Sequence, residues 1–209
     1  MLTQFYDDLE TRTENERKKA ISNVLPVQIK NLQSLGGLKG IDSDMIDSVE
    51  ALKQLPVLRK SELREMQQKK PPFGGLVRGT IEHIFQSPGP IYEPGKDTHD
   101  WWRFGRFLHA CGVGRSDIVQ NCFSYHLTPA GMMFENGAKA VGATILPAGT
   151  GQTELQVQAA FDVGASVYAG TPDYLNTILE KSSEMGLKLS YLKAVVSGGA
   201  LFPSLRESY

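Results

Sequence analysis

Loops that follow short apolar runs hold the residues of this sequence best suited to bind a ligand. The first loop contains Ser87 and Gly89. A loop that binds phosphate needs glycines for close backbone approach, free N–H groups, and a hydroxyl or a lysine. Pro88, Pro90 and Pro94 remove N–H donors from this loop. A plain structural turn explains the same residues, so both interpretations stay open.

A second loop, residues 123–131, places aromatic and small residues just before an expected helix. Tyr125 offers a ring face, while Ala130 and Gly131 leave room, which suits a pocket for a flat apolar ligand. Simple core packing under a helix start explains them equally well. We expect His126 to make an ordinary polar contact, because no partner in the sequence marks it as a general base.

The last loop follows the final apolar run and contains Ser197, Gly198, Gly199 and Ala200. Two glycines directly after a strand let a flat group approach the backbone, and a sharp turn would need them just as much.

Two further loops have the composition of helix starts. Thr150 or Thr153 is expected to cap one helix, and Thr171 the next, with Pro172 at its first position.

Cysteine and histidine give no sign of metal or redox chemistry. The two cysteines, Cys111 and Cys122, match no zinc or redox spacing and are expected to be reduced and largely buried thiols. The four histidines show neither HxxxH nor HExxH spacing. We therefore expect no bound metal and assign no catalytic residue.

Expected strands and helices alternate from residue 80 onward. The expected strands are Ile81–Phe85, Ile118–Phe123, Thr144–Leu146, Ser166–Ala169 and Lys193–Ser197. The expected helices are His99–Ala110, Ala130–Val141, Thr153–Val163 and Tyr174–Met185. This alternation predicts an α/β fold: a mainly parallel, doubly wound sheet with helices on both faces. Ligands of such sheets bind at the carboxyl ends of the strands.

The first 75 residues are expected to form a helical lead-in, and residues 76–209 the α/β part. In the lead-in the helical spacing is broken at Pro26 and Pro56, and a capped helix is expected to start at Ser61. Glycines and prolines at residues 71–75 mark the boundary.

Bulk composition excludes several classes of partner. The 22 basic and 23 acidic residues nearly cancel, so charge favours neither nucleic acid nor an anionic membrane. Apolar runs are too short to span a bilayer, and the polar, acidic start is unlike a secretory signal. We expect a cytoplasmic protein.

Four segments in order carry a resemblance to a known family. Leu55–Arg64 is similar to Leu-Pro-x-x-x-Lys-x-Asp-Leu-Arg, and Gly137–Pro147 to Gly-Ala-Glu-x-Leu-Gly-Ala-Thr-Val-Ile-Pro. Gly149–Val157 is similar to Gly-Gly-Gln-Thr-Glu-x-Gln, and Thr171–Leu175 to Thr-Pro-Ser-Tyr. Together they resemble the phenylacetate-CoA ligases of the adenylate-forming (AMP-binding) superfamily, from about Leu55 to the last residue.

The resemblance implies a two-step reaction. A small aromatic or aliphatic carboxylic acid reacts with ATP, assisted by Mg²⁺, to give an acyl-adenylate, and coenzyme A then displaces AMP. It implies a phosphate-loop position at Ser87 and Gly89 and an acyl pocket at Tyr125, Ala130 and Gly131. The nucleotide loop would be Ser197, Gly198, Gly199 and Ala200.

The sequence departs from the family at two of these loops. The family's phosphate loop, Ser-Ser-Gly-Thr-Thr-Gly-x-Pro, is replaced by Gln-Ser-Pro-Gly-Pro-Ile-Tyr at residues 86–92. The nucleotide loop of close relatives, Gly-Ala-Glu-Pro-Trp, is replaced by Gly-Gly-Ala-Leu-Phe-Pro at residues 198–203, nearer to the wider superfamily.

The family's later elements are expected to be absent: the Tyr-Gly-x-x-Glu segment, the ribose-binding Asp, the hinge, and the C-terminal lid with its Lys. We therefore expect an inactive fragment that binds no cofactor tightly and exposes apolar surface or buries it in a homodimer.

Two alternatives stay open. One is a non-catalytic binding or scaffold module of the same fold, which the Ser-Pro-Gly-Pro loop favours. The other is an unrelated α/β enzyme, although no Gly-x-Gly-x-x-Gly follows any expected strand. The DNA sequence after codon 209 would distinguish the enzyme from the module. A continuing frame that encodes the later motifs favours the enzyme, and a stop codon favours the module.

Overall fold

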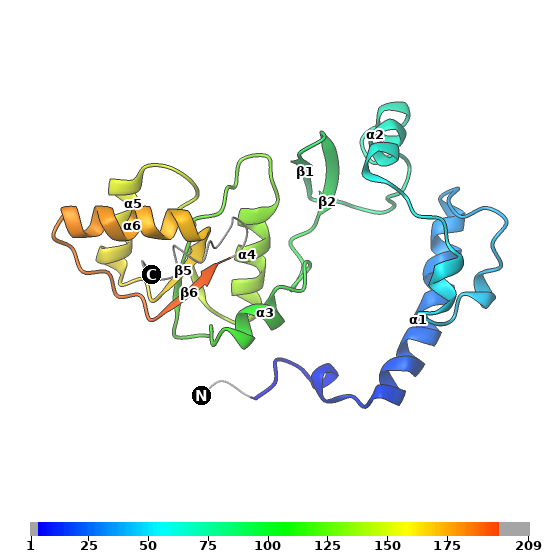
Figure 1. The fold of residues 1–209 in the computed structure, drawn as a ribbon, viewed down its shortest axis with the longest axis horizontal. Coiled ribbons are helices and arrows are strands. Elements are labelled where there is room, and N and C mark those ends of the chain that lie inside the picture. The colour runs from blue at the N-terminus through cyan, green and yellow to red at the C-terminus, as the bar shows by residue number, and fades with distance from the viewer. Residues whose placement is uncertain (1–3, 197–209) are drawn as a thin grey trace. The chain divides into compact units, whose positions relative to one another are not determined.

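A computed structural model describes residues 4–196, which form two compact units (Figure 1). One unit comprises residues 7–96, and the other comprises residues 4–6 with residues 97–196. The helices are α1 (Glu14–Ser34), α2 (Lys60–Lys69), α3 (Gly105–Ala110), α4 (Ala130–Ala140), α5 (Thr153–Val163) and α6 (Pro172–Glu184). Short 3-10 helices are η1 (Asp8–Thr11), η2 (Ser43–Met45) and η3 (Ala51–Gln54). The strands are β1 (His83–Ser87), β2 (Ile91–Gly95), β3 (Ile118–Asn121), β4 (Thr144–Leu146), β5 (Val167–Gly170) and β6 (Lys193–Val196).

The second unit is built around a parallel sheet with the strand order β4-β3-β5-β6. Val119 in β3 lies opposite Ile145 in β4 and Val167 in β5, and Ala169 lies opposite Val195 in β6. Right-handed crossovers through helices connect parallel strands in this way. The predicted α/β class with a parallel sheet is confirmed.

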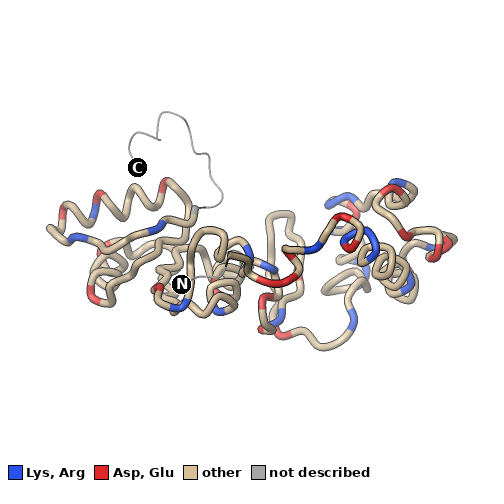
Figure 2. Tube along the Cα trace, turned by 90° about the horizontal axis from the view of Figure 1, so that it is seen from below, with Lys and Arg blue, Asp and Glu red and all other residues tan. Residues whose placement is uncertain are grey.

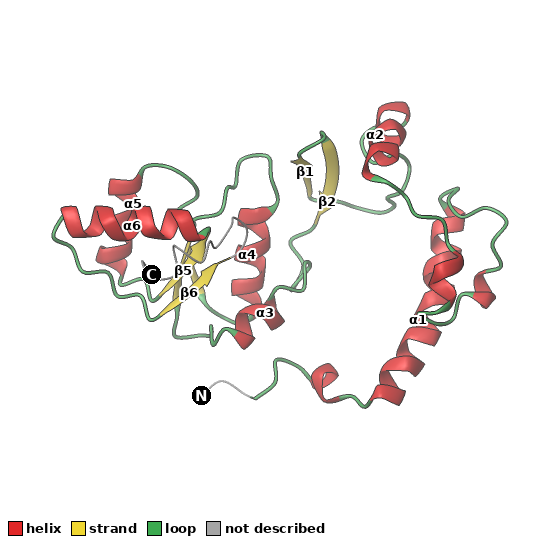
Figure 3. Cartoon of the chain, in the orientation of Figure 1, coloured by secondary structure: helices red, strands yellow, loops and turns green. Residues whose placement is uncertain are grey.

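Alternation along β5 explains why helices cover both faces of this sheet (Figure 3). Val167 and Ala169 are fully buried in a core that includes Leu108 of α3 and Phe134 of α4. Tyr168, between them in sequence, is fully buried in a second core. Its partners there include Val157 of α5 and Leu175 and Ile178 of α6. Successive side chains of a strand point to opposite faces, so one strand anchors both layers.

An ion pair with a buried carboxylate ties three strands together at the amino edge of the sheet. The Lys193 Nζ lies 2.9 Å from both carboxylate oxygens of Asp117, and the Ser166 hydroxyl donates to the same carboxylate at 2.9 Å. The backbone N–H of Gly114 donates to it as well, at 2.9 Å. Burial by itself would raise the pKa of Asp117, but the bonds from Lys193, Gly114 and Ser166 outweigh burial and lower it.

The unit of residues 7–96 begins with a capped helix. The Glu16 carboxylate accepts from the Thr13 N–H at 2.7 Å, and the Glu16 N–H donates to the Thr13 hydroxyl at 3.3 Å, which forms a capping box. Helix α1 continues through Pro26, so the prediction of a break there was wrong. A proline removes one backbone hydrogen bond, and the packing of Ile29 against Ile46 and Ala51 anchors the helix beyond it.

The expected strand at Ile81–Phe85 does not join the parallel sheet. It lies at His83–Ser87 and pairs with β2 as an antiparallel hairpin, in which Ser87 lies opposite Ile91. Including it in the parallel sheet was wrong for a geometric reason. Residues 88–90 are the whole connection, whereas a parallel pair needs a crossover of about a dozen residues.

The expected helix His99–Ala110 is shortened to α3. Asp100 and Arg103 have φ values of 47° and 59°, which an α-helix cannot include. The Asp100 carboxylate instead accepts from the N–H of Gly105, the first residue of α3, at 2.8 Å.

The capped start expected at Ser61 also lies elsewhere. Helix α2 has Arg59 as its N-cap, and its N–H donates to the Glu62 carboxylate at 3.0 Å.

Charge is distributed without a dominant sign in either unit. Lys and Arg are interspersed with Asp and Glu along the trace (Figure 2). Within residues 4–196, none of the helices combines the length and the apolarity that crossing a bilayer requires.

Candidate functional site

The topology of the sheet marks one edge as the place for a ligand. After β3 the chain passes through α4, on one face, to reach β4. After β5 it passes through α6, on the opposite face, to reach β6. The loops after β3 and β5 therefore diverge, and open α/β sheets bind ligands at such a point, outside the carboxyl ends of the strands. We call the loops 122–129 and 147–152, with residues 170–171, the carboxyl edge.

Asn121, the last residue of β3, joins two loops of the carboxyl edge. It is fully buried, and its Nδ2 donates to the Tyr125 hydroxyl and to the Gly131 carbonyl, both at 2.8 Å. Its backbone carbonyl accepts from the Gly149 N–H at 2.9 Å. One buried residue thus fixes the loop after β3 against the loop after β4.

Tyr125 and Gly131 are in direct contact. A Cβ atom added to Gly131 would lie 2.8 Å from the Tyr125 ring and 2.8 Å from the Ser124 carbonyl oxygen. The space beside Gly131 is therefore filled by the Tyr125 ring, and Ala130 is the first residue of α4 beside it. The structure brings together the three residues predicted to form the acyl pocket. Their assignment to that pocket stays a prediction.

The phenol of Tyr125 is held in its neutral form. Burial, and then the nearby Glu135 carboxylate, raise the pKa of Tyr125. The group therefore acts as a hydrogen-bonding partner of Asn121 and presents a half-buried ring at the carboxyl edge. His126, in the same loop, is exposed, and within residues 4–196 its side chain has no hydrogen-bond partner.

Gln156 is the organising residue of the carboxyl edge, and the sequence analysis missed it. It lies in the first turn of α5 with 4% of its surface exposed. Its Nε2 approaches the carbonyl oxygens of Gly151, Gly149 and Ala148 at 2.7, 3.0 and 3.4 Å. Its Oε1 accepts from Gln120 Nε2 at 3.1 Å. The available signal was the last Gln of the Gly-Gly-Gln-Thr-Glu-x-Gln pattern, which falls on Gln156.

Cys122 completes this polar cluster beneath the loop. Its thiol lies 3.3 Å from Oε1 of Gln156, and burial raises its pKa to about 12, so it stays protonated and donates. The Tyr191 hydroxyl donates to the Gln120 side chain from the other side. The expectation of buried thiols holds for Cys122 but is wrong for Cys111, which is exposed.

Two tyrosines also donate to carbonyl groups of the edge. The Tyr174 hydroxyl donates to the Gly151 carbonyl at 3.0 Å, and the Tyr168 hydroxyl donates to the Thr171 carbonyl at 2.9 Å. Thr171 is the N-cap of α6 and Pro172 its first residue, as predicted, although the Thr171 side chain makes no capping bond. Gln152, not Thr150 or Thr153, precedes α5 as its N-cap.

Ser87 and Gly89 lie in the other unit, at the β1–β2 hairpin. The Ser87 hydroxyl oxygen is shielded and has no hydrogen-bond partner within residues 4–196. A Cβ atom on Gly89 would lie 2.9 Å from Ile91, and the flanking Pro88 and Pro90 have no N–H. These features fit a structural turn better than a loop that binds phosphate, and the phosphate-loop assignment stays a prediction.

Ser197, Gly198, Gly199 and Ala200 lie outside the described residues. Within residues 4–196, no group of three His, Cys, Asp or Glu side chains is arranged to hold a metal ion.

Curated relatives share sequence with most of this chain. Phenylacetate-coenzyme A ligase of Aromatoleum evansii is 29% identical over 158 residues, which is 71% of this chain and 35% of the relative. The enzyme of the same name from Thermus thermophilus is 29% identical over 157 residues, 71% of this chain and 34% of the relative. That of Escherichia coli is 28% identical over 157 residues. The chain thus spans about a third of the length of the curated relatives it matches. No family model matches it.

Solved structures share its fold. A 2-hydroxyisobutyryl-CoA ligase in an open conformation, in complex with 2-HIB-AMP and CoA, superposes with a TM-score of 0.82 at 23% identity, over 95% of this chain and 51% of the ligase. The same ligase in its postadenylation state, in complex with R3-HIB-AMP, gives a TM-score of 0.74 at 24% identity, over 85% of this chain and 41% of the ligase. The chain therefore shares the fold of this CoA ligase and covers a part of its length.

Proposed function

We propose that this sequence is part of an ATP-dependent ligase that joins a small carboxylic acid to coenzyme A. The observation that carries the proposal is the 29% identity with a phenylacetate-coenzyme A ligase over 158 residues. In the proposed reaction a carboxylate oxygen attacks the α-phosphorus of ATP and pyrophosphate leaves. The thiol of coenzyme A then attacks the acyl carbon and AMP leaves. Mg²⁺ would offset the phosphate charge.

The contribution we propose for the described residues is to form one wall of the acyl site. Tyr125 presents a half-buried ring, backed by Gly131, at the carboxyl edge. Gln156 and Tyr174 bind the carbonyl groups of Ala148, Gly149 and Gly151, so this part of the edge is held rigid. A rigid wall with an aromatic face suits a small aromatic or aliphatic acid. The adenine would meet residues 197–200, as the resemblance implies.

Binding of an acyl-adenylate analogue tests this proposal. Phenylacetyl-adenosine with a sulfamoyl linker would be titrated into the purified chain by calorimetry. We expect Tyr125→Leu to weaken binding about three- to tenfold, because the aromatic contact is lost. The matched control is Phe161→Leu on the outside of α5, where 44% of the side chain is exposed. No binding, or equal binding by both variants, would contradict the proposed acyl wall.

We further propose that the chain does not complete the reaction by itself, because it spans 35% of the length of its Aromatoleum relative. We expect no acid-dependent release of pyrophosphate when the chain is mixed with phenylacetate, ATP, Mg²⁺ and coenzyme A. We also expect ATP to bind in about the millimolar range. The ribose-binding Asp and the Tyr-Gly-x-x-Glu segment of the family are expected to be absent, and each charge-assisted hydrogen bond lost with them costs roughly 1.5–3 kcal/mol. Sustained thioester formation, followed by mass spectrometry, would contradict this.

A non-catalytic binding or scaffold module is the second candidate, and the hairpin turn favours it. Of residues 88–90 only Gly89 has a backbone N–H, so the turn offers little to a phosphate group. A module of this kind would bind the acyl group equally well with and without the adenosine part. The same titration with phenylacetate alone separates the two candidates. A homodimer and a cytoplasmic location both stay predictions.

A further inference from the structure

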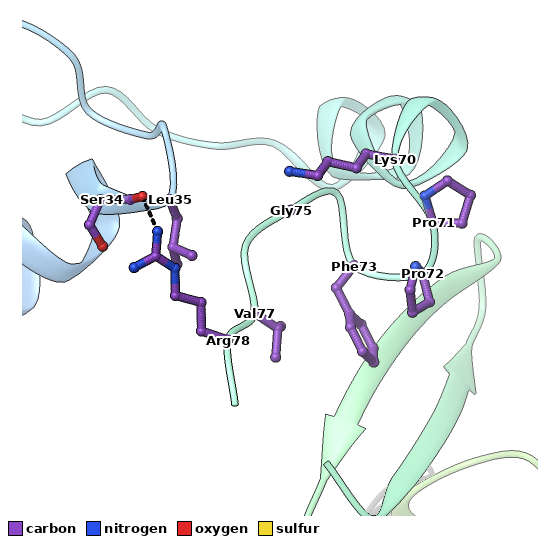
Figure 4. Close-up of a pocket in the computed structure, with 9 residues that line it drawn as sticks. All are labelled: Ser34, Leu35, Lys70, Pro71, Pro72, Phe73, Gly75, Val77 and Arg78. Carbon is purple, nitrogen blue, oxygen red and sulfur yellow. Dashed lines mark hydrogen bonds between the residues drawn. The ribbon is translucent and has the colours of Figure 1, made fainter. Parts of the chain in front are cut away.

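Lys70 and Arg78 line one hollow of about 320 Å³ in the unit of residues 7–96 (Figure 4). The hollow lies between the end of α1 and the loop that follows α2, and its apolar lining includes Leu35, Phe73 and Val77. Figure 4 shows the guanidinium of Arg78 and the ammonium of Lys70 reaching this space from different parts of the loop. The hollow includes neither Ser87 nor Gly89.

The chain turn after α2 directs Lys70 toward the hollow. The Gly74 N–H donates to the Lys70 carbonyl at 2.8 Å and closes the turn. Gly75 follows with φ of 76°, a conformation that favours glycine. A Cβ atom on Gly75 would lie 2.9 Å from the Lys70 Nζ. Only a glycine at this position lets the lysine lie against the loop.

Arg78 is oriented by the carboxyl end of α1. One of its guanidinium nitrogens donates to the carbonyl of Ser34, the last residue of that helix. Carbonyl groups in the last turn of a helix lack intrahelical partners, and a basic side chain satisfies them well. Within residues 4–196 the other N–H groups of Arg78 have no hydrogen-bond partner, so they are available to a ligand.

The hollow carries two positive charges without a counter-charge. None of the residues that line it is acidic. Within residues 4–196, neither Lys70 nor Arg78 forms an ion pair, whereas Lys30, Lys139 and Lys193 each have a carboxylate partner. Two like charges beside one hollow raise its free energy, and an anion placed between them lowers it.

We propose that this hollow binds the phosphate group of a small molecule. The planar guanidinium of Arg78 donates two parallel hydrogen bonds to phosphate oxygens, and Lys70 adds a point charge. Leu35, Phe73 and Val77 contact the organic part. The proposal is independent of the ligase reaction, because none of its residues belongs to the carboxyl edge.

Titration of inorganic phosphate and of phenyl phosphate into the 209-residue chain, by calorimetry at low salt, tests the site. We expect saturable binding in about the millimolar range for inorganic phosphate. Lys70→Gln and Arg78→Gln should each weaken it about tenfold, through loss of a charge-assisted bond. Lys69→Gln is the matched control, because Lys69 is the exposed neighbour of Lys70 and does not line the hollow.

Gly75→Ala provides a second variant that leaves both charges in place. It should weaken phosphate binding by displacing Lys70, and circular dichroism would verify that the variant is folded. Tighter binding of phenyl phosphate would identify an organic monoester as the ligand, and equal binding would identify the phosphate group alone. Absence of saturable binding, or an equal effect of Lys69→Gln and Lys70→Gln, would overturn the proposal.

Discussion

Gln156 shows how one side chain can bind several carbonyl groups of the same loop. The carbonyl groups of Ala148, Gly149 and Gly151 belong to no strand or helix, yet all three meet its Nε2. A buried carbonyl without a donor costs about as much as a lost hydrogen bond. The amide of Gln156 therefore sets the shape of the loop at the carboxyl edge.

Replacing this residue should be costly. We expect Gln156→Leu, which keeps the size and removes the amide, to lower the free energy of unfolding by about 2–4 kcal/mol, because it removes the partner of Gln120 Nε2 and of the Ala148 and Gly149 carbonyl groups. Urea denaturation followed by tryptophan fluorescence measures this. Gln158→Leu is the control, since Gln158 is exposed and its side chain bonds Asp162 on the same helix, and its effect should stay within about 0.5 kcal/mol. Similar losses in both variants would mean that the loop does not depend on Gln156.

At the scale of elements, the sequence predicted best those helices and strands that begin or end next to a glycine. Thr144–Leu146 and Thr153–Val163 were predicted with the bounds that the structure has. Gly142 with φ of 80° precedes the strand and Gly164 with φ of 65° ends the helix. Both are visible in the sequence because glycine favours this conformation.

Contacts between residues far apart in the sequence could not be predicted from it. Arg103 delays the start of the expected helix by adopting a left-handed conformation, and an Arg carries no glycine-like signal. The cluster of Asp117, Ser166 and Lys193 joins residues 49 and 76 positions apart, which no local pattern reveals. Of the candidate site, the sequence indicated Tyr125 and Gly131 but not Asn121 or Gln156, whose roles depend on which loops meet.

The Asp117 cluster should make the stability of the sheet depend on pH. The folded-state pKa of Asp117 lies below its unfolded value, so the stability it contributes is present above about pH 4 and is lost as pH falls through the folded pKa. Lys193→Met removes the cation and should cost about 1–3 kcal/mol at pH 7. The difference from the wild type should shrink as pH falls below about 4 and then through the lower folded-state pKa, where Asp117 of the folded protein becomes protonated.

Denaturation at a series of pH values measures this dependence. Lys188→Met is the control, because Lys188 is exposed and forms no ion pair within residues 4–196. A stability difference for Lys193→Met that stays constant between neutral and acidic pH would show that the lysine acts through packing alone.

At the scale of the whole molecule, each compact unit has a core of its own. Residues 7–96 bury Ile29, Ile46 and Ala51, while the α/β unit buries two clusters on either face of its sheet. A unit with its own core can fold as a unit, so we expect the two to unfold in separate transitions. The only two tryptophans, Trp101 and Trp102, both lie in the α/β unit. Tryptophan fluorescence therefore reports that unit alone, whereas far-ultraviolet circular dichroism reports the helices of both.

Two glutamine variants, one in each unit, test whether the units unfold separately. Gln67 is buried, and its side-chain amide pairs with the backbone N–H and carbonyl of Tyr92 at 2.9 and 2.7 Å, which joins α2 to the hairpin. Gln67→Leu should therefore destabilise residues 7–96 by about 1–3 kcal/mol and shift the dichroism transition while leaving the fluorescence transition in place. Gln156→Leu should shift the fluorescence transition instead. If Gln67→Leu moved both transitions by the same amount, the two units would unfold as one cooperative body. Both tryptophans lie in the α/β unit, so a change in residues 7–96 can shift the fluorescence transition only if the two units unfold together.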